Sequence, residues 1–284
     1  MVRFAATSLV SLAVLGSSSL VSAQFGSTGG VSQGCLQKLV SALSDKDLAS
    51  CLHADGLTGQ LQGADTSSSL VPVIESYLSK SLCPMEPCSQ STLSKINGTF
   101  TDSCSSELSQ PVGDTPNAAQ TIVALLSHYD DLRDAVCLED KNDGDKLCIV
   151  ESLQAYENAT GQPLTISSAM DPLQLAQVSM MEENKTVTCN DCNRAVARTL
   201  DPFYKSLLNQ TGYDAVQQNL TSLCGDDYFS GAMPASIQSS AKDTSTSPNA
   251  ERTSNTDGAF PALKLASWTA VVAGPVFVGF SLLL

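Results

Sequence analysis

Ten cysteines constrain the fold of this chain more than any other feature. They are Cys35, Cys51, Cys83, Cys88, Cys104, Cys137, Cys148, Cys189, Cys192 and Cys224. An even number of cysteines in an extracellular chain predicts a disulfide framework, here of five bridges formed in an oxidising compartment. Ten cysteines can pair in about 945 ways when the usual counting is extended, so the sequence alone leaves the connectivity open.

The first 23 residues have the layout of a secretory signal peptide. Arg3 is followed by an apolar run from Phe4 to Leu15 and by the small-residue exit Val21-Ser22-Ala23. The apolar run is too short to cross a bilayer core, and the exit fits the A-x-A cleavage pattern. We therefore expect residues 1–23 to be removed and the mature chain to begin at Gln24.

The other end of the chain has the order of a signal for a glycosylphosphatidylinositol (GPI) anchor. An apolar tail, 265–284, follows a short spacer and a run of small residues, and no Lys or Arg comes after it. A spanning helix usually has cytoplasmic basic residues beyond it, whereas a GPI signal has this order of small site, spacer and tail. Asp257 is the expected attachment residue, because Gly258 and Ala259 follow it.

Two nearby small residues, Asn255 and Ser254, are alternative attachment sites. In either case residues 258–284, or a slightly longer segment, are expected to be removed, and the tail takes the single tryptophan, Trp268, with it. This processing predicts an outer-leaflet location at the cell surface, held by the lipid.

The mature chain is strongly acidic. Loss of both terminal segments removes Arg3 and Lys264, which leaves 13 Lys and Arg against 29 Asp and Glu, a formal charge of −16. Such a charge disfavours binding to nucleic acid and to anionic membrane surfaces.

Five N-x-S/T sequons without proline lie in the mature chain, and they predict an N-glycosylated surface. The acceptor residues are Asn97, Asn158, Asn184, Asn209 and Asn219. Because a modified asparagine must be exposed, each of these sites is expected on the outside of the fold.

Apolar residues recur at helical spacing through most of the mature chain. The stretches concerned are 35–43, 70–82, 118–137, 148–158, 172–181, 192–208 and 213–224. Asp201-Pro202 is expected to split or kink one of them. No stretch shows convincing alternation of β-branched residues, so the pattern predicts an all-α, disulfide-stapled domain.

The predicted organisation is a leader, 24–34, a cysteine-rich helical domain, 35–230, and a Ser/Thr-rich stalk, 231–257. The stalk has too little apolar surface to fold and is expected to be disordered and O-glycosylated. The cysteines divide five and five around Asn117, which leaves open an origin by duplication of two similar halves. If every cysteine is oxidised, at least one bridge must join the halves.

Several motifs invite interpretation as chemical sites. Cys189-Asn190-Asp191-Cys192 has the C-x-x-C spacing of redox motifs, but Asp191 opposes a thiolate and no βαβ pattern precedes it, so structural bridges are expected. Only two histidines, His53 and His128, are available for a hydrolytic triad, and His128 is expected to be a surface or half-buried residue. The acidic run 140–145 departs from the EF-hand register and is expected to form a solvated turn between helices. Met180-Met181 is expected to fill core space.

The cysteine motifs carry a resemblance to known proteins. They are Cys35-Leu36 with Cys51-Leu52, Leu82-Cys83 with Cys88-Ser89, and the run from Thr188 to Asn193. This pattern resembles a cysteine-rich helical domain of fungal secreted proteins, and the whole layout is similar to that of cryptococcal immunoreactive mannoproteins. The resemblance implies a mannosylated surface antigen without catalytic residues. The haem-binding CFEM class is also similar, but only Asp191 could serve as its aspartate and the cysteine spacing differs.

The leading expectation is a non-enzymatic, GPI-anchored mannoprotein of the fungal cell surface or wall, without a cofactor. Its expected partners are the membrane, through the anchor lipid, and cell-wall glucan or host lectins, through the glycans. Two alternatives stay open at this point. One is an extracellular protein that binds haem, iron or another small ligand, and the other is a surface enzyme with an unrecognised, carboxylate-based site.

Overall fold

The computed structural model describes residues 45–61, 67–109, 118–165 and 185–242, together with Ser32, Gly34, Cys35, Gln37 and Ser41. The signal peptide, the proposed anchor residues, Asn184 and the predicted helix 172–181 lie outside the described residues. Gly34, Cys35, Gln37 and Ser41 are helical, in agreement with the helix predicted over 35–43.

The described chain is mostly helical, as predicted. Its first part contains α3 (Lys46–Cys51), α4 (Ala54–Leu61), α5 (Val71–Tyr77), the π-helical turn η1 (Leu78–Leu82), α6 (Gln90–Ser103) and α7 (Ser105–Leu108). The middle part contains α8 (Ala118–Ser127), α9 (Tyr129–Val136), β1 (Leu138–Asp140), the 3-10 turn η2 (Lys141–Asp143), β2 (Lys146–Leu147) and α10 (Cys148–Thr160). The last part contains α13 (Lys185–Thr188), α14 (Asp191–Thr199), α15 (Asp201–Leu207), α16 (Gln210–Cys224) and β3 (Ile237–Ser239).

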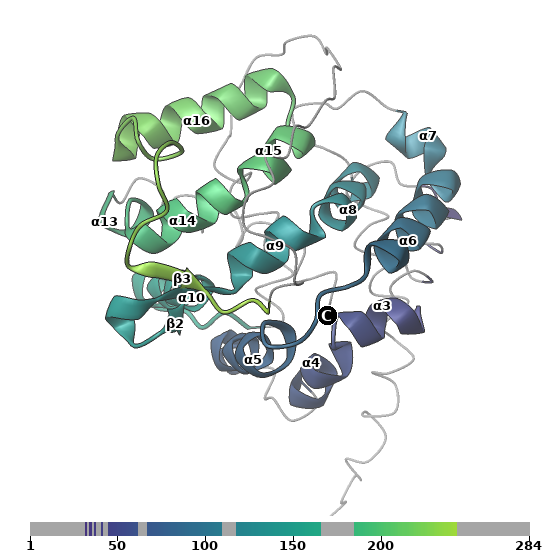
Figure 1. Ribbon diagram of the computed structural model, residues 1–284, viewed down its shortest axis with the longest axis horizontal. Coiled ribbons are helices and arrows are strands. Elements are labelled where there is room, and N and C mark those ends of the chain that lie inside the picture. The colour runs from purple at the N-terminus through teal and green to yellow at the C-terminus, as the bar shows by residue number, and fades with distance from the viewer. Residues whose placement is uncertain are drawn as a thin grey trace, which may run out of the picture.

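Helices α8 and α9 form the middle of the molecule, with α6 and α7 on one side and α13, α14 and α16 on the other (Figure 1). One core cluster is built mainly from α5, η1 and α10, and a second from α14, α15 and α16 packed on α8 and α9. The apolar stripes predicted from the sequence supply most of these buried residues, as expected for amphipathic helices around a shared core.

Two of the predicted helices are each divided in two. The stretch 192–208 breaks at Leu200, and Pro202 stands in the first turn of α15, where a missing N–H costs nothing. The stretch 118–137 also breaks, at His128, whose φ of −113° and ψ of 27° leave the helical region. Apolar spacing continues across this second break, so the break has no signature in the sequence pattern.

A small antiparallel sheet accompanies the helices, with strand order β2-β1-β3. The acidic run 140–145, expected as a turn between helices, is instead the turn of the β1–β2 hairpin. Asp140 Oδ1 accepts a hydrogen bond from Asn142 N–H at 2.8 Å, and Gly144 adopts a φ of 69°, which favours glycine. Strands of two or three residues are too short to show alternation in the sequence.

The folded domain extends further toward the C-terminus than predicted. The sequence predicts a stalk from residue 231 onward, but β3 pairs with β1, and Ile237 is buried opposite Asp140. Ser240 N–H donates to Cys137 O at 2.9 Å, and Lys242 N–H donates to Cys83 O at 2.8 Å. Residues 231–242 therefore belong to the fold, and 243–257 lie outside the described residues.

All ten cysteines are paired in five disulfides, as predicted. The bridges are Cys35–Cys104, Cys51–Cys88, Cys83–Cys137, Cys148–Cys192 and Cys189–Cys224. One of them, Cys83–Cys137, joins the two cysteine groups. The second and fourth cysteines pair in each half, but the other pairings differ, so the duplication stays a hypothesis.

Removal of the bridge between the halves is expected to destabilise the domain strongly. The Cys83–Cys137 bridge closes a loop of 54 residues in sequence, and the chain-entropy model assigns about 4 kcal/mol to a loop of that length. A Cys83→Ala/Cys137→Ala variant should show this loss in the free energy of unfolding by urea, with peptide mapping confirming the other bridges. A free energy equal to that of the unaltered chain would contradict the expectation.

Candidate functional site

The C-x-x-C motif does not form a dithiol or a local disulfide. Cys189 is bridged to Cys224, and Cys192 is bridged to Cys148. Asn190 caps α14 by accepting from Asn193 N–H at 2.7 Å. The motif therefore ties α14 to α10 and α13 to α16, which confirms the expected structural role. Asp191, the candidate haem aspartate, accepts from the Ser236 hydroxyl at 2.8 Å.

The two histidines lie on different elements. His128 stands at the α8–α9 break, where its Nδ1 lies 2.9 Å from Asp131 Oδ2. Its ring packs edge-on against the Phe203 ring, with 6.1 Å between the ring centroids. His53 closes the turn between α3 and α4 with a φ of 50°. Asp131 and Phe203 thus orient the His128 ring at the helix break, and the side chain is 21% exposed, in agreement with the half-buried position expected for it.

Within the part of the chain that the structure describes, one group of three potential metal ligands comes together, formed by Asp140, Glu151 and Cys192. Cys192 is bridged, so its sulfur has no thiolate to offer a metal. Burial raises the pKa of Glu151, and the charges of Asp140 and Asp143 add to this effect. The two remaining carboxylates are far fewer than the six to eight oxygen ligands that Ca²⁺ takes, so the group makes a poor cation site.

A buried arginine holds the C-terminal segment onto the fold. Arg133 of α9 is 4% exposed and donates to the carbonyl oxygens of Lys242 at 3.2 Å, Cys83 at 3.0 Å and Met85 at 2.5 Å. A buried charge is costly unless hydrogen bonds compensate for lost water, and these carbonyls supply that compensation. Arg133 thus joins α9, the end of η1 and the last described residue.

A second arginine binds several backbone carbonyls of the loop before β3. Arg198 Nε donates to Tyr228 O at 2.9 Å, and its terminal nitrogens donate to the carbonyls of Asp227, Ser230 and Ala232. Together the two guanidinium groups fix the chain from α16 to the last described residue.

A buried carboxylate holds the N-terminal segment onto the fold. Glu107 of α7 is 2% exposed, and it accepts from the Ser106 hydroxyl at 2.6 Å and from Ser32 N–H at 2.8 Å. These hydrogen bonds lower the pKa of Glu107 from 4.5 to about 2, and the bond from Ser106 has the largest effect. The nearby Cys35–Cys104 bridge adds a covalent link between the same two segments.

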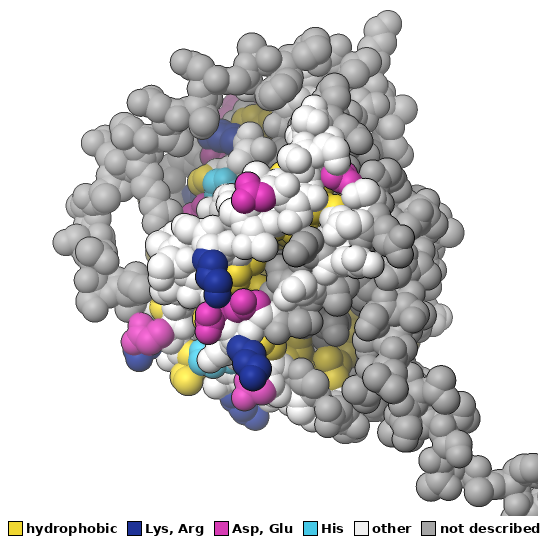
Figure 2. Space-filling model, turned by 90° about the vertical axis from the view of Figure 1, so that its right-hand side faces the viewer, with side chains coloured by type: hydrophobic (Ala, Val, Ile, Leu, Met, Phe, Trp, Pro, Cys, Tyr) yellow, Lys and Arg dark blue, Asp and Glu magenta, His cyan; other side chains and the backbone are white. Residues whose placement is uncertain are grey.

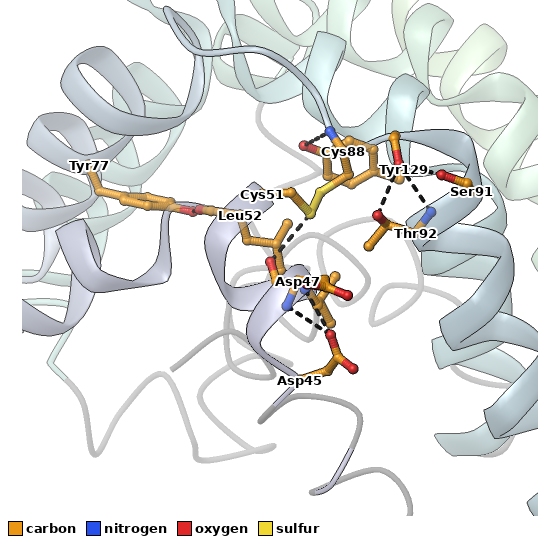
Figure 3. The surroundings of a disulfide bond; sticks show 11 residues. Asp45, Asp47, Cys51, Leu52, Tyr77, Cys88, Ser91, Thr92 and Tyr129 are labelled. Carbon is orange, nitrogen blue, oxygen red and sulfur yellow. Dashed lines mark hydrogen bonds between the residues drawn. A yellow bond between two sulfur atoms is a disulfide. The ribbon is translucent and has the colours of Figure 1, made fainter.

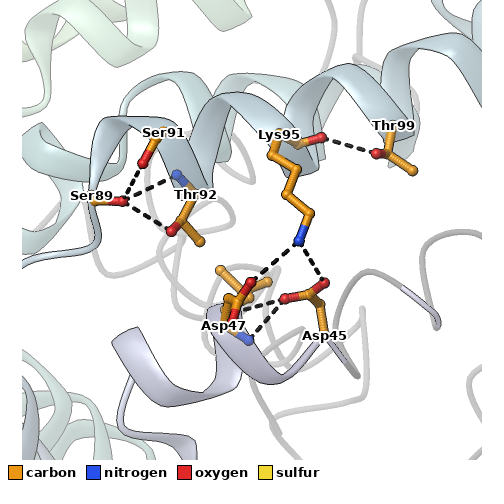
Figure 4. Close-up of polar contacts among 8 residues, drawn as sticks. Asp45, Asp47, Ser89, Ser91, Thr92, Lys95 and Thr99 are labelled. Carbon is orange, nitrogen blue, oxygen red and sulfur yellow. Dashed lines mark hydrogen bonds and ion pairs between the residues drawn. The ribbon is translucent and has the colours of Figure 1, made fainter.

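Helix α6 is held at both ends by disulfides. Cys88 precedes its N-cap, Ser89, and Cys104 is its C-cap residue. Figure 3 shows the Cys51–Cys88 bridge between α3 and α6, where Cys88 N–H donates to the Tyr129 hydroxyl at 3.4 Å. Figure 4 shows the second link between these helices, in which Lys95 lies 3.2 Å from Asp47 and 3.6 Å from Asp45.

The composition of α6 is poor for a helix. Its sequence, QSTLSKINGTFTDS, is rich in Ser and Thr, and only Leu93, Ile96 and Phe100 are buried. Gly98 weakens the helix by about 1 kcal/mol relative to alanine, and a Cβ at this position would have no atom within 4 Å. Figure 2 shows the side of the molecule on which α6 lies, where backbone and uncharged polar side chains (white) make up most of the described surface and only a few charged side chains appear. Packing of α6 against the rest of the domain and its two flanking disulfides must therefore stabilise this helix more than its intrinsic helix propensity does.

The four described sequons all lie on helices or helix ends, with side chains that are exposed or half-buried. Asn158 and Asn219 are exposed, within α10 and α16. Asn209 is half-buried and caps α16 by accepting from Gly212 N–H at 2.8 Å, and Asn97 is half-buried within α6.

These features define a disulfide-stapled helical domain whose N- and C-terminal segments are clamped by buried charged side chains. The chain belongs to the family described as "Domain of unknown function (DUF7729)", which its residues 20–233 match. Comparison with curated proteins and with solved structures found no match. Among the described helices, none combines the length and apolar character needed to cross a bilayer.

The Glu107 clamp predicts a defined pH dependence. A carboxylate whose pKa is lower in the folded state stabilises the fold above its unfolded pKa, and this contribution is lost as the pH falls. The destabilisation caused by Glu107→Gln, about 1.5 kcal/mol near neutrality, should therefore shrink between pH 4.5 and pH 2, the ordinary and lowered pKa of Glu107. Urea unfolding across this range measures the effect. Glu75→Gln, at an exposed position, controls for loss of one charge, and a pH-independent difference for Glu107→Gln would contradict the assignment.

Arg133→Met should release the C-terminal segment, because the carbonyls of Cys83, Met85 and Lys242 lose a charged donor. We expect a loss of about 2 kcal/mol in unfolding free energy, with faster hydrogen exchange at the amides of Ser240 and Lys242. The matched control, Arg198→Met, should speed exchange at Tyr228 instead. Equal protection of Lys242 in the unaltered chain and in Arg133→Met would show that the guanidinium is not the clamp.

Proposed function

We propose that this chain is a non-enzymatic, GPI-anchored mannoprotein of the fungal cell surface or wall, with a disulfide-stapled domain carried on a glycosylated stalk. The observation that carries the proposal is the complete pairing of its ten cysteines. Structural bridges of this number are typical of chains that fold in the secretory pathway. The signal peptide and the tail signal expected from the sequence agree with that compartment.

The mechanism we propose is physical. The anchor fixes the location, the Ser/Thr-rich stalk sets the distance from the bilayer, and the glycans form a hydrated layer around the domain. The four described acceptor asparagines lie on three different helices or their ends, α6, α10 and α16, which supports a coat spread over the domain. Glycans then provide the groups that meet cell-wall glucan or host lectins.

Clamping at both ends of the described domain supports the same role. At Lys242, the last described residue, Arg133 and Cys83 bind the backbone. A domain displayed on a stalk in the extracellular medium must resist proteases and local unfolding, and secured ends with cross-linked helices reduce both.

Release by phosphatidylinositol-specific phospholipase C tests the anchor. Intact protoplasts treated with this enzyme should release a chain that ends between Ser254 and Gly258 and lacks Trp268, as read by intact mass and C-terminal peptides. A retained chain that still contains Trp268 would overturn the proposal.

A pair of variants tests the attachment segment itself. Replacing Ser254, Asn255 and Asp257 by Trp should abolish lipidation, because the attachment site requires small residues. The same number of changes in the stalk, Ser245→Trp, Ser247→Trp and Asn249→Trp, should leave anchoring intact. Equal anchoring of the two variants would contradict the assigned attachment segment.

A further inference from the structure

The sequon at Asn97 differs from the other described sequons in how its acceptor amide is engaged. Asn97 Nδ2 donates to the Ser127 hydroxyl at the end of α8, at 3.3 Å, and the side chain is half-buried. The Thr99 hydroxyl of the same sequon donates to Lys95 O at 2.9 Å (Figure 4). Once α6 is docked, the acceptor amide of Asn97 is bonded to α8 and the Thr99 hydroxyl is bonded to its own helix, so both groups that a glycosyltransferase must engage already have partners.

Two exposed sequons provide the comparison. The Thr160 and Thr221 hydroxyls also bond to carbonyls of their own helices, at 2.9 and 2.8 Å, but Asn158 and Asn219 present exposed side chains. Among the described sequons, only that of Asn97 lies in a helix whose two ends are both fixed by disulfides, through Cys88 and Cys104.

The sequence of α6 makes this arrangement conditional. Its Ser, Thr and Gly content disfavours a helix in isolation, so α6 is expected to form only when it docks and its flanking bridges close. Before that point the Asn97 sequon is part of an open chain. Afterwards Asn97 is half-buried in a helix, and its amide is bonded to Ser127 of α8.

We propose that closure of the bridges flanking α6 controls glycosylation of Asn97, so that this sequon is occupied in only part of the molecules. The inference rests on the proposed identity as a secreted glycoprotein. Each bridge forms as two thiols give two electrons and two protons to a disulfide-carrying oxidant of the secretory pathway. The chain that closes first leaves Asn97 unmodified, and the chain that is modified first folds with a glycan.

The transfer that competes with closure uses a lipid pyrophosphate-linked sugar as donor. A bond forms between Asn97 Nδ2 and the anomeric carbon of the sugar, while the bond from that carbon to the phosphate oxygen breaks. The lipid pyrophosphate leaves with the bonding electrons, and one amide proton passes to a base of the enzyme. Nothing is oxidised or reduced in this step, so the two reactions compete only through the conformation of α6.

Site-specific occupancy in the full chain tests the proposal. The chain is expressed in a fungal host, total cell-associated and secreted protein is pooled, and each sequon is quantified after enzymatic deglycosylation in heavy-oxygen water. In the unaltered chain Asn97 should be less occupied than Asn158 and Asn219. Cys51→Ser/Cys88→Ser should raise occupancy at Asn97 alone. The matched control, Cys189→Ser/Cys224→Ser, opens a bridge beside α16 and should leave Asn97 unchanged.

A second pair of variants changes α6 in the opposite direction without breaking a bridge. Gly98→Ala keeps a valid sequon, introduces no contact within 4 Å and favours the helix, so it should lower occupancy at Asn97. Gly59→Ala, also in open space but in α4, is the control and should have no effect.

The outcomes separate this inference from the proposed function. Full occupancy of Asn97 in the unaltered chain, or occupancy that does not respond to Cys51→Ser/Cys88→Ser, would overturn the inference while Asn158 and Asn219 still carry glycans. Absence of glycan from every sequon would overturn the proposed function and this inference together.

Discussion

The junction of the Cys83–Cys137 disulfide with the Arg133 guanidinium is the interaction on which the rest of the structure depends. The bridge joins the end of η1 to the end of α9, and it lies within the core cluster built on α5 and α10. Arg133 binds carbonyls of Cys83, Met85 and Lys242 around this bridge. Without the junction, no disulfide would join the two cysteine groups, and the C-terminal segment would lose the hydrogen bond between Arg133 and Lys242.

Most of the helical architecture could be predicted from the sequence, because amphipathic helices record their buried face in a repeating pattern. Helices α10 and α16 and the division at Asp201-Pro202 follow directly from apolar spacing and proline chemistry. The oxidised state of the cysteines was predictable for a different reason, since an even number of cysteines behind a predicted signal peptide favours complete pairing. Neither argument contains information on which cysteine meets which.

The remaining features depend on contacts between distant segments, which no local pattern records. Arg133 follows Leu132 in α9, where it reads as a flanking surface residue until the carbonyls it binds are known. Glu107 is similar, because one of its partners, Ser32, is distant in the sequence. Strand β3 lies in a region that composition assigns to a stalk, and only its pairing with β1 makes it part of the fold. One cue is available in the sequence. A charged residue next to the apolar stripe of a helix can be buried, and it then needs partners from another segment.

The way in which residues 225–242 are attached also determines how the domain responds to a pulling force. Upstream this segment is fixed by the covalent Cys189–Cys224 bridge, whereas at its far end it is held by the hydrogen bonds of β3, Ser240 and Lys242. A pull from the C-terminal side therefore loads the hydrogen bonds first, and full peeling releases at most about 60 Å of extended chain. Beyond that length the tension passes through the disulfides into the helices. The segment can therefore extend under load, but the Cys189–Cys224 bridge limits how far.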